Sequence, residues 1–471
     1  MENRLQRLNE ELEDILFELN TKYSSDLQAA HVVSRTVEDL PPQSIELNKS
    51  IELVSELQNV LIPPLHKVVD GIFGNTPQLP RPLFITRLIL FSRSLPTGHA
   101  LPSSELQTIG SCLLFIAFTT SKALASAVHY KIPDLLNQHG RLSAIALAKL
   151  TTPPTEPGAL LQLLRLLANS VGIFEYDPED ETFSNNPASS LLATDHWTRW
   201  HLWAHLYPTA FYDIFANLEN SISESEPQTA TQIQYKAEAT EPFYALLSRL
   251  PWARQFFETI GAGSTAMAPG MLADYPWTEV NEGPVCDIGG GNGEFLFTLL
   301  QANEKMTGAI LELKGSVAMK AATDNFAAAG ESEGEQTGGK FAAVNQRVFS
   351  VHAGDFFVEV PPYPVYTIRW TLHNWGEEQS ELILRNIRSA IQKARKPNSR
   401  LLIIESVVTD SRMGRPAMYG SVIMMAGSKG GKERTEKEWR QLCARTRWTV
   451  HGIHVLKNCI PCILDLRPTD E

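Results

Sequence analysis

The pattern of hydrophobic and polar positions divides the chain into a helical half and a half in which strands alternate with helices. In the second half, short apolar runs of strand length are separated by turn residues and by helix-periodic or polar segments. These runs lie at residues 284–287, 308–313, 348–355, 366–372 and 401–406. Alternation of this kind is typical of an α/β fold with a doubly wound parallel sheet.

The first half is rich in amphipathic helical patterns. Apolar residues recur at three- and four-residue steps from Leu5 to Leu19 and from Leu47 to Leu61, which predicts two helices with one apolar stripe each. Such a stripe is either a dimerisation arm or the buried face of a helix within its own domain. The polar tract 221–234 interrupts the later helical patterns and predicts a surface loop.

These patterns predict four segments along the chain. They are a helical N-terminal extension (1–105), a compact helical domain that ends in a small β-hairpin (106–195), a helical linker rich in aromatic residues (196–275) and the α/β domain (276–471). We expect a few aromatic side chains of the linker to line an apolar pocket, because a flat organic ligand needs aromatic walls with sparse polar groups.

Composition narrows the class of protein. The 53 acidic residues outnumber the 41 basic ones, which gives a formal net charge of −12, and no run of five Lys or Arg residues occurs. A protein that neutralises many phosphates needs the opposite balance, so we expect no nucleic-acid partner. No secretory leader or uninterrupted apolar span is visible, so we expect a cytoplasmic protein that does not interact with membranes. The C-x-x-C at Cys459–Cys462 lacks a second pair and is interpreted as part of a strand.

The stretch PVCDIGGGNGEFLFTLL, residues 284–300, carries the clearest chemical signal. An apolar run reaches Asp287, glycines follow, and a helix-periodic segment begins at Phe295, which predicts a strand, a tight turn and a helix. Glycines adopt positive φ and let a ligand approach the backbone closely. Residue 294 is Glu, so the third glycine of the dinucleotide fingerprint is missing and a pyrophosphate ligand is disfavoured.

Several motifs in one order resemble those of the plant- and fungal-type class I S-adenosylmethionine-dependent small-molecule O-methyltransferases, over about residues 110–465. The glycine turn is similar to the first motif of that family. The segment SKALASAVHYKIPDLLNQHGRLSAIALAKL, followed by LLQLLRLLANSVGIFEY, resembles its dimerisation domain. The resemblance implies a Rossmann-like doubly wound methyltransferase sheet, an N-terminal, mostly helical, winged-helix-like dimerisation domain, a homodimer, and S-adenosyl-L-methionine as the cofactor.

The resemblance also implies which residues bind this cofactor. Glu312 replaces the family's usual Asp, 23 positions beyond Gly289, in the region where doubly wound sheets bind ribose hydroxyls. Asp355 and Phe356 match the residues that contact adenine in the family, and Arg369 stands where Lys is common. The implied cofactor-binding set is Asp287, Gly289, Gly291, Glu312, Asp355, Phe356 and Arg369.

A second group of residues is implied to carry the chemistry. The segment IRWTLHNWGEEQ resembles the family's Lys-Trp-x-Leu-His-Asp-Trp signature and implies His373 as the general base, flanked by Glu405 and Glu433. A carboxylate on one ring N–H fixes the tautomer, so that the other nitrogen can accept a proton. The implied substrate-binding residues are Trp375, Met424 and Ser428, and no metal is expected.

The predicted function is an O-methyltransferase that acts on a phenolic or enolic small molecule, in secondary metabolism of the fungal type. An alternative keeps the fold and the cofactor but catalyses a pericyclic or dehydrative step without methyl transfer. Three departures from the family pattern leave that alternative open: Asn374 for Asp, Lys314 after the acidic residue, and Ser428 where Asn is frequent. A non-enzymatic scaffolding role is suggested only by the N-terminal helices and the winged-helix-like domain.

Overall fold

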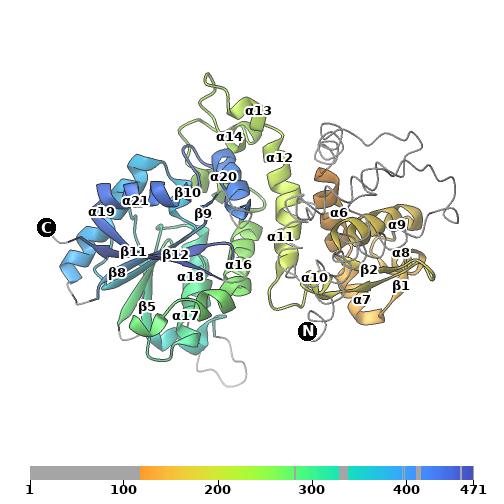
Figure 1. The fold of residues 1–471 in the computed structure, drawn as a ribbon, viewed down its shortest axis with the longest axis horizontal. Coiled ribbons are helices and arrows are strands. Elements are labelled where there is room, and N and C mark those ends of the chain that lie inside the picture. Colours follow the sequence, from red (N-terminus) through yellow and green to blue (C-terminus); the bar gives the residue numbers. More distant parts are fainter. Residues whose placement is uncertain are drawn as a thin grey trace, which may run out of the picture. The chain divides into compact units, whose positions relative to one another are not determined.

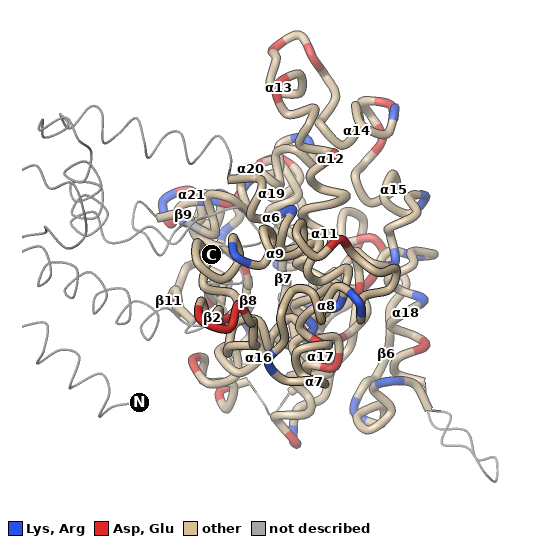
Figure 2. Tube along the Cα trace, turned by 90° about the vertical axis from the view of Figure 1, so that its right-hand side faces the viewer, with Lys and Arg blue, Asp and Glu red and all other residues tan. Residues whose placement is uncertain are grey.

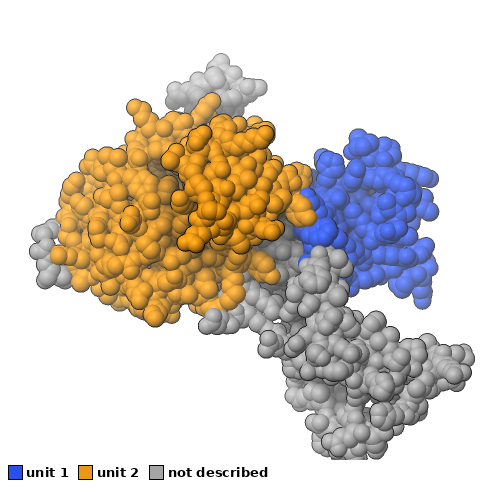
Figure 3. All heavy atoms as spheres, turned by 90° about the horizontal axis from the view of Figure 1, so that it is seen from above, with its two compact units in different colours: residues 1–194 blue, residues 195–471 orange. Residues whose placement is uncertain are grey.

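The computed structural model describes residues 117–280, 283–327, 338–394, 396, 398–409, 415–456 and 459–469. These residues form two compact units that divide between Thr194 and Asp195 (Figure 3). The two amphipathic stripes predicted before residue 62 lie outside the described residues.

The described residues of the first unit, from 117 on, form helices and a three-stranded antiparallel sheet in the order β1-β3-β2. Its helices are α6 (Phe118–His129), α7 (Ile132–His139), α8 (Ala144–Leu150), α9 (Pro157–Leu166) with the π-helical turn η2 (Leu167–Val171), and α10 (Pro187–Ser190). Its strands are β1 (Leu142–Ser143), β2 (Phe174–Asp177) and β3 (Thr182–Asn185). The β2–β3 hairpin confirms the hairpin predicted after the helices, and its Phe183 is fully buried against them.

Helices open the second unit. They are α11 (Trp200–Leu206), η3 (Tyr207–Phe211), α12 (Tyr212–Phe215), α13 (Leu218–Ser221), α14 (Ala230–Gln234), α15 (Phe243–Ser248), α16 (Ala253–Ala273) and η4 (Trp277–Glu279). The surface loop predicted at 221–234 is wrong at its end, where α14 is buried. Thr229 caps that helix by accepting from the Gln232 N–H, and Thr231 donates to the Ala426 carbonyl at 3.0 Å. A capping box and this distant partner override the polar composition.

The α/β part of the second unit contains a seven-stranded sheet in the order β11-β12-β8-β7-β4-β5-β6 (Figure 1). Its strands are β4 (Pro284–Ile288), β5 (Thr307–Glu312), β6 (Val348–Ala353), β7 (Val365–Arg369), β8 (Arg400–Glu405), β11 (Trp448–Val455) and β12 (Cys462–Pro468). Strands β4 to β8 are parallel, and β12 pairs antiparallel with β8. The sheet confirms the predicted doubly wound class, and the strand order reverses beside β4, where such sheets bind ligands.

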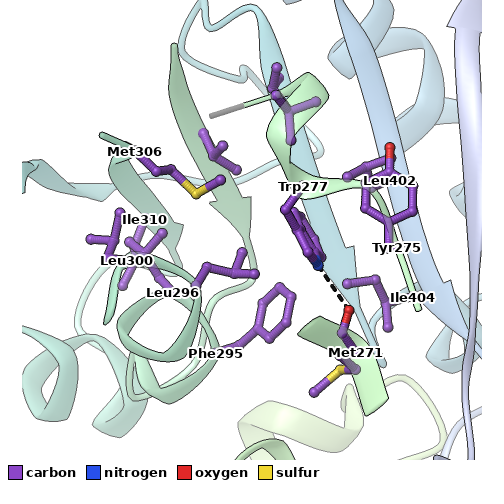
Figure 4. Packing of buried hydrophobic residues seen from close by; sticks show 14 of the residues in the cluster. Met271, Tyr275, Trp277, Phe295, Leu296, Leu300, Met306, Ile310, Leu402 and Ile404 are labelled. Atoms are coloured by element: carbon purple, nitrogen blue, oxygen red, sulfur yellow. Dashed lines mark hydrogen bonds between the residues drawn. The ribbon is translucent and has the colours of Figure 1, made fainter. Parts of the chain in front are cut away.

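Helices cover both faces of this sheet. One face is covered by α16, α17 (Glu294–Ala302) and α18 (Val317–Asn325), and the other by α19 (Glu377–Ala394) and α21 (Glu436–Arg445). The remaining elements are η5 (Ala342–Arg347), η6 (Leu372–Asn374), β9 (Val407–Val408), α20 (Arg415–Gly427) and β10 (Arg434–Thr435). Figure 4 shows the first core, in which Trp277 packs among Phe295, Leu296 and Ile404 and donates to the Met271 carbonyl at 2.8 Å.

Charge is mixed over the described residues. Lys and Arg are scattered among Asp and Glu over many elements, and acidic residues gather at the β2–β3 turn (Figure 2). Among the described helices, none combines the length and the hydropathy that a membrane crossing requires.

Candidate active site

The glycine turn after β4 is shaped by three residues with positive φ: Gly289 (+63°), Gly291 (+61°) and Gly293 (+86°). A β-carbon at Gly293 would lie 2.3 Å from the Phe326 ring, so this position is closed on the core side. A β-carbon at Gly291 would meet nothing within 4 Å. The turn is therefore packed against the core at one end and open at Gly291, where a ligand can approach the backbone.

The acid at the end of β5 lies beside this turn. One Glu312 oxygen accepts from the Gly291 N–H at 3.0 Å, and the other accepts from the Leu313 N–H at 3.0 Å and the Ser316 hydroxyl at 3.3 Å. Burial raises the pKa of Glu312, while these hydrogen bonds oppose the rise. Because Glu312 occupies the Gly291 N–H, this amide is not free for a phosphate, in agreement with the missing third glycine of the dinucleotide fingerprint.

Two further charges lie beneath the turn. Asp287 is buried, accepts from the Thr367 hydroxyl at 2.7 Å, and has a pKa that burial raises to about 6. The Arg369 guanidinium packs over the Trp370 ring at 4.6 Å, and burial lowers its pKa to about 10. Its Nη1 is buried without a hydrogen-bond partner among the described residues. A buried donor without a partner is costly and indicates the place of an absent acceptor.

Aromatic residues gather near the expected adenine site, in the segment that follows β6. Asp355 is half-buried, and its Oδ1 accepts from the Phe357 N–H at 2.8 Å. The Trp375 ring meets the Phe357 ring edge-on at 4.8 Å and the Phe356 ring at 6.2 Å. The Trp375 indole N–H is buried with no partner in the described part of the chain. The structure thus brings Trp375, which was expected at the substrate, next to Phe356, which was expected at the cofactor.

His373 lies in η6, just past the carboxyl end of β7, and its ring contacts two carboxylates. Nδ1 is 2.7 Å from Oε1 of Glu433 and 3.3 Å from Oε2 of Glu405. The other Glu405 oxygen accepts from the backbone N–H groups of Thr371 and Leu372, at 2.8 and 2.9 Å. Both carboxylates and the ring are buried. The structure therefore assembles the three residues that the sequence motifs placed together.

The two carboxylates change the basicity of the imidazole. Burial on its own lowers the pKa of His373, but the charges of Glu405 and Glu433 outweigh it and raise the pKa to about 9. Burial also raises the pKa of Glu405 to about 7, against the opposing effect of the imidazolium and the backbone N–H groups. Both carboxylates contact Nδ1, so Nε2 is the ring nitrogen that contacts neither acid.

The same three residues offer ligand atoms within 4.8 Å of one another, a cluster that could surround a metal ion. Two ligands of one tetrahedral zinc lie about 3.3 to 3.4 Å apart, given bonds of about 2.0 to 2.1 Å. The Nδ1–Oε1 separation of 2.7 Å is shorter and is typical of a charge-assisted hydrogen bond. The geometry of the cluster is that of a hydrogen-bonded triad of one histidine and two carboxylates.

Helix α20 and the loop after it pack on the triad. The His373 carbonyl accepts from the Lys432 N–H at 2.8 Å, and a β-carbon at Gly420 would lie 3.2 Å from Oε1 of Glu433. The predicted substrate residues Met424 and Ser428 lie in and just after α20, and their backbones border Gly431, close to the His373 carbonyl. Both residues are half-buried, and their backbone lies near that of His373.

Sequence analysis missed Arg434, which is fully buried beside Glu433. Its guanidinium donates to the carbonyls of Leu372 and Trp375 at 3.2 and 3.0 Å, and to the Ser380 hydroxyl at 3.0 Å. It therefore holds the turn that carries His373. A lone Arg in a charged segment gives no sequence signal of this role, because the partners are about 50 to 60 residues away.

Asn374 and Tyr244 also meet at this site. The Asn374 amide nitrogen lies 3.3 Å from the Tyr244 hydroxyl on α15, and 3.3 and 3.2 Å from the carbonyls of Trp370 and Thr371. The helical linker was expected to contribute to the pocket, but nothing in the sequence distinguished Tyr244 from the other aromatic residues.

Comparison with known proteins identifies the family to which this chain belongs. Residues 215–448 match the model of the O-methyltransferase domain, and residues 112–195 match that of the O-methyltransferase dimerisation domain. O-methyltransferase sirM of Leptosphaeria maculans is 37% identical over 99% of this chain and 100% of its own length. O-methyltransferase verK of Clonostachys rogersoniana is 40% identical over 79% of this chain and 86% of its own.

Among solved structures, the mitomycin 7-O-methyltransferase MmcR is 25% identical and aligns with a TM-score of 0.61, over 78% of this chain and 98% of its own. The relatives confirm the predicted family and enzyme class. The strand-end residues, the helical domain and these matches together show that the chain belongs to the S-adenosylmethionine-dependent O-methyltransferase family.

Proposed function

We propose that this O-methyltransferase acts on a phenolic or enolic hydroxyl of a small molecule, with His373 as the general base. The observation that carries the proposal is the contact of His373 Nδ1 with two buried carboxylates, which leaves Nε2 to accept a proton. Glu405 and Glu433 fix the ring and stabilise the imidazolium that forms.

The residues around the glycine turn fit S-adenosylmethionine. Gly291 leaves open space above the turn. The Glu312 oxygen that accepts only from the Gly291 N–H retains a lone pair for a ribose hydroxyl. The unpartnered Nη1 of Arg369 suits the cofactor's carboxylate, while Asp355 and Phe356 would hold the adenine. The amides of Gly289, Gly291 and Gly293 already donate to groups of the protein, which disfavours a phosphate at these positions. When bound, S-adenosylmethionine supplies an electrophilic methyl group on a sulfonium.

The raised pKa of His373 lowers the free-energy cost of transferring a proton from a phenol to the imidazole. A phenol and an ordinary imidazole differ by about 3.5 pKa units, or roughly 5 kcal/mol for full proton transfer. With the pKa of His373 at about 9, the difference from a phenol is about 1 unit, or roughly 1.4 kcal/mol. The triad therefore makes His373 a base matched to a phenolic or enolic proton.

The expected biological role and assembly follow from the relatives. The relatives named above include two fungal O-methyltransferases and an enzyme named for mitomycin, which supports a substrate from secondary metabolism. The dimerisation-domain match at 112–195 supports a homodimer. Light scattering at micromolar concentration tests the homodimer, and a monomer mass would contradict it.

The function is tested by incubating the protein with labelled S-adenosylmethionine and candidate phenols, and measuring product and S-adenosylhomocysteine together. One equivalent of S-adenosylhomocysteine per product is expected. His373→Ala should lower turnover by about 10² to 10⁴-fold and leave cofactor affinity nearly unchanged. His451→Ala, at an exposed position on β11, is the control and should retain full activity. Product that forms while the cofactor stays intact would instead indicate the pericyclic or dehydrative alternative.

A further inference from the structure

The contact between Asn374 and Tyr244 has a defined polarity. The Asn374 side-chain nitrogen faces two backbone carbonyls, of Trp370 and Thr371, at 3.3 and 3.2 Å. Carbonyls only accept hydrogen bonds, so the amide must present its NH₂ group to them, and the same group faces the Tyr244 hydroxyl at 3.3 Å. Tyr244 is therefore the acceptor in this contact. The Asp that the family signature carries at this position would face both carbonyls with negative charge.

A hydroxyl that accepts from Asn374 keeps its own proton for another partner. In the described part of the chain, Asn374 is the one hydrogen-bond partner of Tyr244, and the Tyr244 side chain is only half-buried. Burial, followed by the charges of Glu312 and Glu405, raises the pKa of Tyr244, so the hydroxyl stays protonated. Asn374 follows His373 directly in η6, so the contact with Asn374 places the Tyr244 hydroxyl at the turn that carries His373.

The chemistry of methyl transfer limits what this donor can bind. The attacking oxygen loses electron density as its bond to the methyl carbon forms, and a hydrogen bond donated to that oxygen would hold the density back. A donor beside the base is useful on a different oxygen of the substrate, where it fixes the orientation of the attacking hydroxyl.

We propose that Tyr244, positioned by Asn374, donates a hydrogen bond to a second substrate oxygen next to the hydroxyl that is methylated. The substrate class is then an ortho-oxygenated phenol, or an enol with a neighbouring carbonyl. This inference rests on the proposed function, since it requires His373 to act on the first oxygen. Tyr244 serves as a specificity-determining residue, and Asn374 serves as a positioning residue.

The test compares phenols that differ only in the place of the second oxygen. The probes are 2′-hydroxyacetophenone against 4′-hydroxyacetophenone, and catechol against hydroquinone. The native protein should favour the ortho member of each pair in kcat/KM. Tyr244→Phe should reduce the ortho-to-para ratio by about 3- to 10-fold, the worth of one hydrogen bond. Asn374→Asp should reduce the ratio in the same direction, because a carboxylate would accept the hydrogen bond of the Tyr244 O–H and so withdraw this donor from the substrate.

The matched control is Tyr235→Phe, which removes a hydroxyl that accepts from Trp252 at 2.8 Å elsewhere in the same helical linker. It should leave the ratio unchanged. Calorimetry with S-adenosylhomocysteine should give the same affinity for native protein and Tyr244→Phe. A weaker affinity would assign Tyr244 to the cofactor and overturn the proposal, as would an unchanged ratio or turnover of neither ortho probe. Failure of the proposed function would appear separately, as activity that survives in His373→Ala.

Discussion

The glycine turn and the histidine triad follow neighbouring strands, β4 and β7, but they are assembled from the sequence in different ways. The turn is closed within itself and by the adjacent strand β5: Gly293 N–H donates to Gly290, while Gly289 and Gly291 N–H donate to Leu311 and Glu312 of that strand. The triad needs Glu405 and Glu433, which lie 32 and 60 residues beyond His373. The turn thus depends on glycine backbone conformation and on the strand next to it, whereas the triad depends on longer-range packing and buried charge.

Arg434 gives the strongest test of this long-range dependence. Arg434→Met should destabilise the protein by about 3 to 5 kcal/mol, because it leaves the carbonyls of Leu372 and Trp375 and the partner charges without a donor. Denaturant unfolding measures the change. Arg440→Met, which removes an exposed ion pair on α21, should change stability by less than about 1 kcal/mol. Equal losses in the two variants would show that Arg434 does not hold the η6 turn.

The turn can be tested with two glycines that both have positive φ but have different surroundings. Gly293→Ala places a β-carbon 2.3 Å from the Phe326 ring at φ +86°, and should cost about 2 to 4 kcal/mol of stability. Gly291→Ala meets open space, so only backbone strain of about 1 kcal/mol is expected, together with weaker binding of S-adenosylhomocysteine. Thermal unfolding and calorimetry separate the two effects. If Gly291→Ala lowers stability but binds S-adenosylhomocysteine as tightly as the native protein, Gly291 does not face the cofactor.

The triad predicts a rise of activity with pH. A base must be neutral to accept a proton, and the pKa of His373 is raised to about 9, so kcat/KM should increase with pH and level off above about pH 9. Glu433→Gln removes one of the charges that raise this pKa, so the plateau should be reached at lower pH. Glu436→Gln, at an exposed position, is the control and should leave the profile unchanged. A profile that does not move in Glu433→Gln would contradict the electrostatic account.

The same pKa also links His373 to stability. The folded-state pKa lies above the unfolded value of about 6.5, so this contribution is fully present below about pH 6.5 and is lost as pH rises through about 9. Its size is about 3 kcal/mol for a rise of about 2.5 pKa units. Denaturant unfolding at pH 6.5 and pH 9.5 should therefore show a smaller difference in Glu433→Gln than in the native protein. If stability changes equally between pH 6.5 and pH 9.5 in both proteins, the triad is not the cause of the pH dependence.

The smallest effect is expected from the packing of α20 on the triad. A β-carbon at Gly420 would lie 3.2 Å from Oε1 of Glu433, so Gly420→Ala should displace the carboxylate by a few tenths of an ångström and lower kcat by a few-fold. Gly427→Ala on the same helix meets Phe243 at an ordinary 3.8 Å and should have no such effect. Steady-state kinetics of both variants measures kcat, and cofactor affinity serves as a check on folding. An equal kcat in the two variants would contradict the prediction.

The sequence alone determined the α/β class, the β2–β3 hairpin and the glycine turn, because each depends on periodicity or on residues close together in the chain. The positive φ values at Gly289, Gly291 and Gly293 agree with the conformation that only glycine adopts readily. The motif resemblance also indicated the two acids that the structure places on His373. Composition was misleading at α14, where the capping box at Thr229 and a distant carbonyl on α20 decide the conformation.

Only the tertiary structure decided the charge states and the supporting contacts. The pKa of His373 depends on two carboxylates whose distance from the ring and burial are set by packing, since desolvation and charge compete with similar strength. Arg434 and Tyr244 acquire their roles from partners more than 50 residues away. Periodicity cannot specify such pairs, because one burial pattern is compatible with many side-chain partners, and the distances between these atoms are fixed only when the elements pack together.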